Sequence, residues 1–503
     1  MQKILILDHG GQTDQLLARR IRECHVFCEV YPASVMNMEK LRAFNPLGII
    51  LTGDPHSGVG IDPSVLQLGI PVLGVGRCCT AMAERLGATA ASVEHAYGRT
   101  LINLKDDAVL FAGFPPVTIS WMDHDRQITG LPQGLYATAS TKDCPIAAFS
   151  CPERKLYGMQ FHPEAAHTEG GIRMLKRFLV DICGAEEQWR MENVINHSID
   201  EIRRRVGTRR VLLALSGGVD SSVAAALLSR AVGSQLTCIF VDHGMLRQDE
   251  GDQVEAYFSR MDLNFIRVNA AQRFLSRLEG VADPDDKRRI VGEEFVRVFE
   301  EEARKIGDVD FLAQGTIYPD ILENGLGYAD VVRSQREMDG LPDHIEFKEL
   351  IEPLRLLFKD EVRQLGRTMG LPEFLVGRQP FPGPGLAIRI VGSITPEKIA
   401  ILRQADHIFA SELEKAHIHD HIGQYFAVLT DTQLYNPAVP TRRKEYCLAL
   451  RAVTTEDFST AKWARLPYEL LDKISEQILR TVPAIARVVY DITSKPPASI
   501  EWE

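Results

Sequence analysis

The sequence contains no apolar run long enough to cross a membrane, and it has no low-complexity tract. It also starts without the charged and then apolar segment of a secretory signal. The nine cysteines are scattered without the paired spacing of a metal site, which favours free thiols. These absences predict a cytoplasmic protein that does not associate with membranes.

An excess of basic residues is missing as well, because the formal net charge is −11. A general nucleic-acid binder normally carries a basic excess, so nucleic acid is not an expected partner. The remaining composition, 45% hydrophobic and 25% charged, is ordinary for a globular protein. Since 503 residues are too many for one core, we expect several domains.

The most informative stretch is 211–228, VLLALSGGVDSSVAAALL. Its apolar start lacks alternation, which predicts a strand buried on both faces. Gly217 and Gly218 allow the backbone to turn sharply and to approach a ligand closely. A helix opened by Ser221 and Ser222 would point its free N–H groups back at this turn. The arrangement favours a phosphate group.

Asp220 is the unusual residue of this loop, because phosphate repels a carboxylate unless a metal lies between them. Mg²⁺ is the metal expected there. The loop lacks the Gly-Lys-Ser/Thr ending of a Walker A motif, and an ordinary strand-to-helix turn is the alternative reading. SGGVDSS resembles the pyrophosphate loop of the N-type ATP pyrophosphatases, which implies that ATP is cleaved between its α and β phosphates.

Two further strands point to the same nucleotide crevice. Residues 236–242 form an apolar run that ends in Asp242, and residues 311–316 carry Gly315 at the tip of another. Ligands bind at the carboxyl ends of strands in an open α/β sheet. The residues expected to bind ATP are Ser216, Gly217, Gly218, Val219, Asp220, Ser221, Ser222, Asp242 and Gly315.

Lys359 resembles the lysine of this family that meets the released pyrophosphate, and a solvated helix charge is the alternative. Asp220 and Lys359 are therefore the residues expected to act in the ATP chemistry.

Residues 1–184 alternate short apolar runs with helical stretches, which is the α/β pattern. We expect strands at 3–7, 48–51 and 71–75, and helices at 12–23 and 80–86. Near the end of this block, His162 precedes Glu164 by two residues at a predicted strand end. Such a pair can serve as a base and its orienting group, or it can be purely structural.

The segments ILILDHGGQTDQLLARRIRE, PVLGV and QFHPEAAHT resemble the class I glutamine amidotransferases. In that family a cysteine at a strand-to-helix elbow attacks glutamine, and ammonia is released. The resemblance implies that His162 and Glu164 match the residues that activate this cysteine.

The elbow itself departs from the family, because the nucleophile position is Gly76. The oxyanion turn carries Asp54, which is unfavourable where negative charge must be stabilised. Without a nucleophile we expect no glutaminase activity. The alternative nucleophile is Cys78, and Cys79 is the next thiol along the chain. A thiol two residues further along a helix points about 200° away, which disfavours this alternative.

Residues 378–386, RQPFPGPGL, combine three prolines and two glycines, which predicts a rigid loop with exposed N–H groups. Together with SGGVDSS and the ending KPPASIEWE, this loop resembles the guanosine monophosphate synthetases over essentially the whole chain. In that family Lys495 would meet the phosphate of xanthosine monophosphate, while Ile500 and Glu501 would meet its base or ribose. The residues expected to bind the acceptor nucleotide are Arg336, Pro382, Gly383, Pro384, Gly385, Lys495, Ile500 and Glu501.

The resemblance implies a multidomain α/β protein. The expected parts are a class I amidotransferase-like domain at 1–184, a connector helix at 185–208, a doubly wound ATP pyrophosphatase domain at 209–390 and a C-terminal α+β dimerisation domain at 391–503. In the last part we expect helices at 396–416 and 468–480 and strands at 425–429 and 446–451. A homodimer is the expected assembly.

Two segments near the acceptor depart from the family. The paired imidazoles of one segment are replaced by Gln335 and Arg336. A second segment, 431–444, lacks the family turn, although Arg442 and Arg443 could supply a basic group. Three hypotheses remain open: an ammonia-dependent synthetase of this type that uses ATP and Mg²⁺, a relative acting on another nucleotide or amine, and a nucleotide sensor without turnover.

Overall fold

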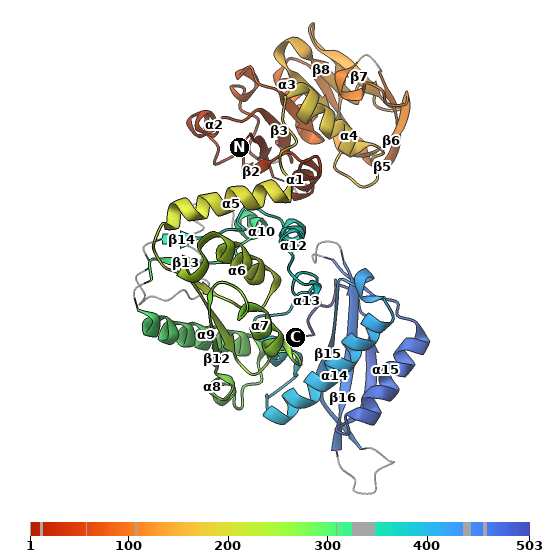
Figure 1. Cartoon of the computed structure of the whole chain (residues 1–503). Helices are drawn as coiled ribbons and strands as arrows, with labels where there is room; N and C mark the ends of the chain where they lie inside the picture. Colours follow the sequence, from red (N-terminus) through yellow and green to blue (C-terminus); the bar gives the residue numbers. More distant parts are fainter. Residues whose placement is uncertain are drawn as a thin grey trace. The chain divides into compact units, whose positions relative to one another are not determined.

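The computed structural model describes residues 2–10, 14–56, 58–105, 108–307, 309–323, 347, 349–435, 444–455 and 460–502. The chain divides into two compact units (Figure 1). The first contains Met1–Val194, and the second begins at Ile195 and holds the rest of the chain, apart from a short stretch that starts at Pro319. No helix in the described ranges combines the length and the apolar composition needed to span a membrane.

The first unit is built on a nine-stranded sheet with the order β2-β1-β3-β4-β9-β8-β7-β5-β6. Its strands are β1 (Ile4–Asp8), β2 (Cys28–Pro32), β3 (Gly48–Thr52), β4 (Val72–Val75), β5 (Thr89–Leu104), β6 (Val117–Gly130), β7 (Tyr136–Ser140), β8 (Ala148–Cys151) and β9 (Leu156–Met159). The helices are α1 (Asp14–Glu23), α2 (Met38–Phe44), α3 (Arg77–Arg85) and α4 (Gly171–Lys176).

The sheet is parallel from β2 to β9 and antiparallel beyond it. Strands β3, β4 and β9 are buried along their whole length, as expected of parallel strands covered on both faces. The long ribbon of β5 and β6 instead alternates between more and less exposed residues. Because such alternation marks one covered face, this ribbon lies at the less protected edge of the sheet.

The second unit contains a five-stranded parallel sheet with the order β12-β11-β10-β13-β14. Its strands are β10 (Val211–Ala214), β11 (Leu236–Asp242), β12 (Asn264–Asn269), β13 (Phe311–Ala313) and β14 (Glu349–Ile351). The helices of this part are α6 (Val219–Val232), α7 (Glu250–Phe258), α8 (Ala271–Arg277), α9 (Pro284–Ile306), α10 (Tyr318–Glu323), α12 (Lys359–Thr368) and α13 (Glu373–Val376).

This strand order confirms the doubly wound arrangement. The chain runs outward from β10 through β11 to β12 and then returns to β13 on the other side of β10. The order therefore reverses between β10 and β13, and ligands bind at such a switch point in open α/β sheets. The loop after β10 carries the SGGVDSS motif, so the fold places this motif at the expected edge.

The C-terminal part of the second unit has a four-stranded sheet covered by two helices (Figure 1). Its elements are α14 (Pro396–Lys415), β15 (Gln424–Tyr435), β16 (Lys444–Thr454), β17 (Lys462–Trp463), α15 (Tyr468–Thr481) and β18 (Ile485–Asp491). Strand β16 pairs with β15 in antiparallel fashion and with β18 in parallel. The mixed sheet confirms the predicted α+β character of this part.

Three predicted helix starts are wrong: those of α6, of α3 and of the connector helix. Helix α6 begins at Val219 because Gly218 is its extended N-cap residue, two positions earlier than predicted. Helix α3 begins at Arg77, three residues earlier than predicted, directly after Gly76.

The connector helix α5 (Met191–Val206) is shorter than the predicted 185–208. Trp189 lies just before it, is buried, and stacks on Phe27 with ring centroids 4.6 Å apart. The Trp189 N–H also donates to the His25 carbonyl at 2.8 Å. Because the segment around Trp189 packs on the first unit, it is not part of helix α5.

Candidate active site

A cavity of about 660 Å³ lies where β10 ends, which is within the usual size range of ligand sites. Its walls come from the SGGVDSS loop, helix α9, the start of α12 and the Pro–Gly segment. Among the predicted site residues, the lining includes Ser216, Gly218, Val219, Asp220, Lys359, Pro382, Gly383 and Pro384. The segment expected to bind ATP and the one expected to bind the acceptor therefore line one cavity.

The SGGVDSS loop is held by its own serine hydroxyls. The hydroxyl oxygens of Ser216 and Ser221 lie 2.9 Å apart, and the Ser221 hydroxyl donates to the Gly218 carbonyl at 3.3 Å. Gly217 has φ +76°, a conformation that favours glycine. Helix α6 starts directly behind this loop, and the first N–H groups of a helix have no intrahelical acceptor. The loop can therefore present N–H donors to an anion.

Asp220 and Lys359 meet in the wall of the cavity. Asp220 lies on the first turn of α6 and Lys359 is the first residue of α12, yet Nζ of Lys359 is 2.6 Å from Oδ2 of Asp220. Oδ1 of Asp220 is shielded from solvent and has no hydrogen-bond partner among the described residues. A carboxylate oxygen without a partner beside a phosphate loop suits Mg²⁺, which prefers oxygen ligands.

Five of the residues predicted to bind ATP lie outside the cavity lining: Gly217, Ser221, Ser222, Asp242 and Gly315. Asp242 pairs with Arg267, with Oδ2 and Nη2 2.7 Å apart, and Ser222 is fully buried. A Cβ on Gly315 would lie 3.1 Å from the backbone nitrogen of Ser221. The glycine therefore lets the segment after β13 approach the start of α6. The Gly217 carbonyl accepts a hydrogen bond from Arg378 at 2.6 Å.

The C-terminal tail is fixed by two buried arginines. Arg389 donates to the Glu501 carboxylate from Nε at 3.3 Å and from Nη2 at 3.2 Å. Arg451 donates to the Ile500 and Ser499 carbonyls, both at 2.7 Å. Ile500 also packs on the sheet of β15 and β16.

The remaining acceptor residues lie as follows. Glu501 approaches the Pro–Gly segment through Gln424, whose amide lies 3.0 Å from Glu501 and 3.4 Å from the Pro380 carbonyl. Lys495 pairs with Ala461 through the backbone, and Gly385 packs tightly because a Cβ there would overlap the Met245 carbonyl oxygen. Neither of these two lines the cavity. The predicted positions Gln335, Arg336, Arg442 and Arg443 lie outside the described residues.

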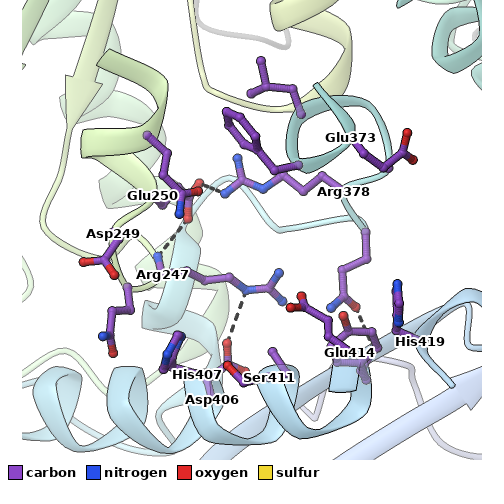
Figure 2. A pocket seen from close by; sticks show the side chains of 18 of the residues that line it. Arg247, Asp249, Glu250, Glu373, Arg378, Asp406, His407, Ser411, Glu414 and His419 are labelled. Atoms are coloured by element: carbon purple, nitrogen blue, oxygen red, sulfur yellow. Dashed lines mark hydrogen bonds and ion pairs between the residues drawn. The ribbon is translucent and has the colours of Figure 1, made fainter. Parts of the chain in front are cut away.

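A second cavity of about 480 Å³ is drawn in Figure 2. It shares lining residues with the first cavity. Its lining comes from the residues around α7, from α13 and from α14. Glu250, Arg378 and Gln379 line both cavities, so they separate the two spaces.

Several residues that line the first cavity have no role that the sequence predicts. Arg378 stands in the Pro–Gly segment, but its partner Glu250 is 128 positions away, so the pattern could not reveal the pair. His243 follows the predicted strand end at Asp242 and was detectable from that position alone. Burial lowers the pKa of His243 to about 4, so its imidazole is neutral at pH 7.

In the first unit, Gly76 faces His162. Gly76 has φ +60° at the start of α3, and a Cβ there would lie 2.7 Å from Cε1 of His162. Nδ1 of His162 is 2.7 Å from the Glu164 carboxylate. Burial opposes protonation of His162, but the charge and hydrogen bond of Glu164, together with the interactions of Asp123, outweigh it and raise the pKa of His162. The His162–Glu164 pair, which would act as base and orienting group in a glutaminase, thus faces a residue that has no side chain.

Cys78 is not placed to replace the missing nucleophile. It is fully buried on the first turn of α3, and its sulfur lies 3.6 Å from the Gly53 carbonyl. Burial, with the nearby charges of Asp8 and Asp54, raises the pKa of the Cys78 thiol well above its usual value. Burial likewise raises the pKa of Cys79. Because the thiolate is the reactive form, these raised pKa values favour the unreactive thiol form of both residues.

Two departures from the amidotransferase pattern pair with each other. Nη1 of Arg77, the residue after Gly76, is 2.6 Å from Oδ2 of Asp54 in the oxyanion turn. Nη2 of Arg77 lies 3.5 Å from Asp125. The acidic residue in the oxyanion turn is therefore neutralised by the basic residue at the elbow.

Known families match three parts of the chain. The class-I glutamine amidotransferase family matches residues 5–182, the tRNA methyl transferase HUP domain matches 209–276, and the GMP synthase C-terminal domain matches 411–502.

Relatives match the chain over its whole length. Glutamine-hydrolyzing GMP synthases from Acetivibrio thermocellus and Ruminiclostridium cellulolyticum are 53% and 52% identical, covering 99% and 100% of this chain and 99% of each relative. One from Finegoldia magna is 50% identical over 100% of this chain and 99% of its own length. With the cavity at the switch point of its sheet and this extent of identity, the chain belongs to the GMP synthase family.

Proposed function

We propose that this chain is an ATP-dependent ligase that aminates xanthosine monophosphate with free ammonia. The observation that carries the proposal is the contrast between its two sites. The second unit has a complete SGGVDSS loop in a cavity that also contains the Pro–Gly segment. The first unit has glycine at the position that faces His162.

The reaction consists of two displacements. The carbonyl oxygen of the acceptor base attacks the α-phosphate of ATP, and pyrophosphate leaves with the electrons of the broken P–O bond. Ammonia then attacks the activated ring carbon and displaces adenosine monophosphate, losing one proton overall. Neither step needs a covalent enzyme intermediate, so positioning and charge neutralisation carry the catalysis.

The residues around the loop have distinct roles in this scheme. The N–H groups at the start of α6 bind the pyrophosphate portion of ATP. Lys359, held 2.6 Å from Asp220, lies where its ammonium can neutralise the charge that develops on pyrophosphate. Oδ1 of Asp220 would hold Mg²⁺, which supplies further neutralisation of phosphate charge.

Ammonia is the proposed amine source because three features of the first unit oppose glutamine hydrolysis. Gly76 has no nucleophile, and Cys78 is buried with a raised pKa. Arg77 and Asp54 form an ion pair between the elbow and the oxyanion turn, so the Arg77 guanidinium already has a partner of opposite charge and a carboxylate stands in the turn. Acyl transfer from glutamine needs both an activated nucleophile and free donors for the oxyanion.

The test supplies the enzyme with xanthosine monophosphate and ATP, and with either ammonium or glutamine. We expect guanosine monophosphate, adenosine monophosphate and pyrophosphate in equal amounts with ammonium, and no glutamate from glutamine. Cys78→Ala should leave both results unchanged. Glutamate release that disappears in Cys78→Ala would contradict the ammonia-dependent reading.

The same assay separates the two other hypotheses. ATP consumption with a different nucleotide, but not with xanthosine monophosphate, would favour a specialised relative, which the substitutions at Gln335 and Arg336 motivate. Absence of pyrophosphate release with every nucleotide would favour a sensor. Release that is lost in Asp220→Asn would dismiss the sensor.

A further inference from the structure

We propose that Arg378 is a positioning residue that fixes the SGGVDSS loop in its phosphate-binding shape, with Glu250 holding Arg378 in place. The inference rests on the proposed use of this loop for ATP. Nη1 of Arg378 donates to the Gly217 carbonyl at 2.6 Å, and Nη2 pairs with the Glu250 carboxylate. One planar guanidinium therefore joins the loop to helix α7.

The contact controls the direction of an N–H group in the loop. The Gly217 carbonyl and the Gly218 N–H belong to the same peptide unit, in which the two groups point in opposite directions. Because Arg378 fixes the Gly217 carbonyl, the Gly218 N–H points toward the Ser216 hydroxyl, 3.3 Å away. Both Ser216 and Gly218 line the nucleotide cavity.

This control matters because the loop contains the most permissive residues. Gly217 has φ +76°, and glycine adopts positive and negative φ with similar ease. The peptide between Gly217 and Gly218 could therefore adopt more than one orientation. The bond from Arg378 selects the orientation that keeps the loop ready for phosphate.

Glu250 is itself held from the C-terminal part of the unit (Figure 2). Its second oxygen accepts the Arg247 N–H at 2.8 Å, and Nε of Arg247 lies 3.3 Å from Asp406 on α14. Asp406 in turn accepts the N–H of Ala427 on β15 at 2.9 Å. Arg378 is thus clamped between the phosphate loop and a chain of contacts that ends on the sheet carrying the C-terminal tail.

Burial makes the pair suitable for this role. The side chains of Arg378 and Glu250 are 13% and 5% exposed, so solvent screens their interaction little. Removal of the whole arginine side chain would leave a buried carboxylate without its partner and could unfold the region. Arg378→Lys is the better probe, because lysine keeps the charge but cannot reach Gly217 and Glu250 with one planar group.

The experiment measures the binding of magnesium pyrophosphate and of ATP to the full chain by calorimetry, together with the KM for each substrate. For Arg378→Lys we expect dissociation constants for both ligands, and the KM for ATP, to rise about tenfold. The KM for xanthosine monophosphate should stay within about twofold. Glu250→Gln should give a smaller change in the same direction, because it keeps the acceptor but loses the charge.

The matched control is Arg367→Lys. Arg367 forms a comparable pair with Glu373, 2.6 Å apart, but is exposed and does not line the nucleotide cavity. The Arg367→Lys variant should leave the affinity for pyrophosphate unchanged. A folded Arg378→Lys variant with normal pyrophosphate affinity would overturn the proposal, and so would equal losses for all three substrates with a lowered Tm.

If Arg378→Lys does not fold, Glu250→Gln decides by the same criteria. The binding measurement also separates this inference from the proposed function, since pyrophosphate and ATP can bind without turnover. A wild-type chain that binds pyrophosphate but aminates no nucleotide would contradict the proposed function and leave the role of Arg378 measurable.

Discussion

Gly76 shows, at the scale of a single residue, why we expect that one substitution would not give glutamine hydrolysis. A side chain at this position would overlap the ring of His162, and φ is +60°. A non-glycine residue in such a conformation costs roughly 1–3 kcal/mol. The Arg77–Asp54 ion pair would also remain in the oxyanion turn.

We therefore expect Gly76→Cys to release no glutamate from glutamine and to lower the stability of the first unit. Glutamate assays and thermal melting of the full chain check this. The comparison is the combination of Gly76→Cys, Arg77→Tyr and Asp54→Gly, which supplies the thiol and also removes both members of the ion pair. Glutamine hydrolysis by the single variant would refute the reasoning.

His243 gives a prediction on pH. Its pKa is about 4 in the folded chain and about 6.5 when unfolded. Between these values the unfolded chain binds a proton that the folded chain does not, so stability falls as pH falls through this window. The loss approaches about 3 kcal/mol near pH 4.

The measurement is urea unfolding of the second unit within the full chain at pH 7 and pH 5. His243→Asn should show a smaller loss between the two, because asparagine stays neutral and keeps an acceptor near the Met245 N–H. An equal loss in both proteins would show that His243 does not carry the effect.

At the scale of elements, the C-terminal tail depends on Arg451. This fully buried residue of β16 donates to Ile500, Ser499 and Thr493 carbonyls and to the Asp491 carboxylate. In Arg451→Met these acceptors lose their donor, and the largely buried Asp491 carboxylate loses its ion-pair partner, which costs roughly 3–5 kcal/mol. We expect the KM for xanthosine monophosphate to rise at least about tenfold, because the tail carries the residues expected to hold that nucleotide.

Steady-state kinetics and limited proteolysis of the C terminus check this prediction. Pyrophosphate affinity should be retained, and Arg480→Met, which alters an exposed residue of α15, should behave like the wild type. A normal KM for xanthosine monophosphate in Arg451→Met would show that the tail does not contribute to binding of the acceptor.

The elements also show what the sequence could and could not predict. Strand β11 matches its predicted bounds, and α14 and α15 match theirs within one residue, because long apolar runs and strong helical periodicity are local properties. The antiparallel ribbon of β5 and β6 and the short strand β17 were not predicted, because their pattern depends on which face neighbouring strands cover.

The same limit applies to the site. SGGVDSS is contiguous and could be read directly. The pairs of Arg378 with Glu250 and of Arg77 with Asp54 join residues far apart in sequence. The charged residues of both pairs can be read from the sequence, but only the fold of the chain shows that they lie close together.

At the scale of the whole molecule, the expected homodimer stays a prediction. Adjacent elements α15 and β18 leave large apolar side chains exposed, including Tyr468 at 86% and Val489 at 38%. Exposed apolar side chains on neighbouring elements are typical of protein interfaces. Light scattering should therefore give twice the 56.2 kDa mass of one chain.

The variant Tyr468→Glu with Val489→Glu should weaken this assembly, because it would bury two unpaired carboxylates at the interface. Leu16→Glu, on an exposed position of the first unit, is the control. A wild-type chain that stays monomeric at micromolar concentration would contradict the predicted dimer.

The ion pair of Arg77 with Asp54 has a consequence for the history of this enzyme. Reverting Arg77 alone removes the ion-pair partner of Asp54, and restoring the thiol first places it against the imidazole of His162. We therefore expect each of these single steps toward the amidotransferase pattern to be unfavourable. On the proposed function, a lineage with this chain would depend on ammonium from its surroundings or from other deaminating enzymes to make guanine nucleotides.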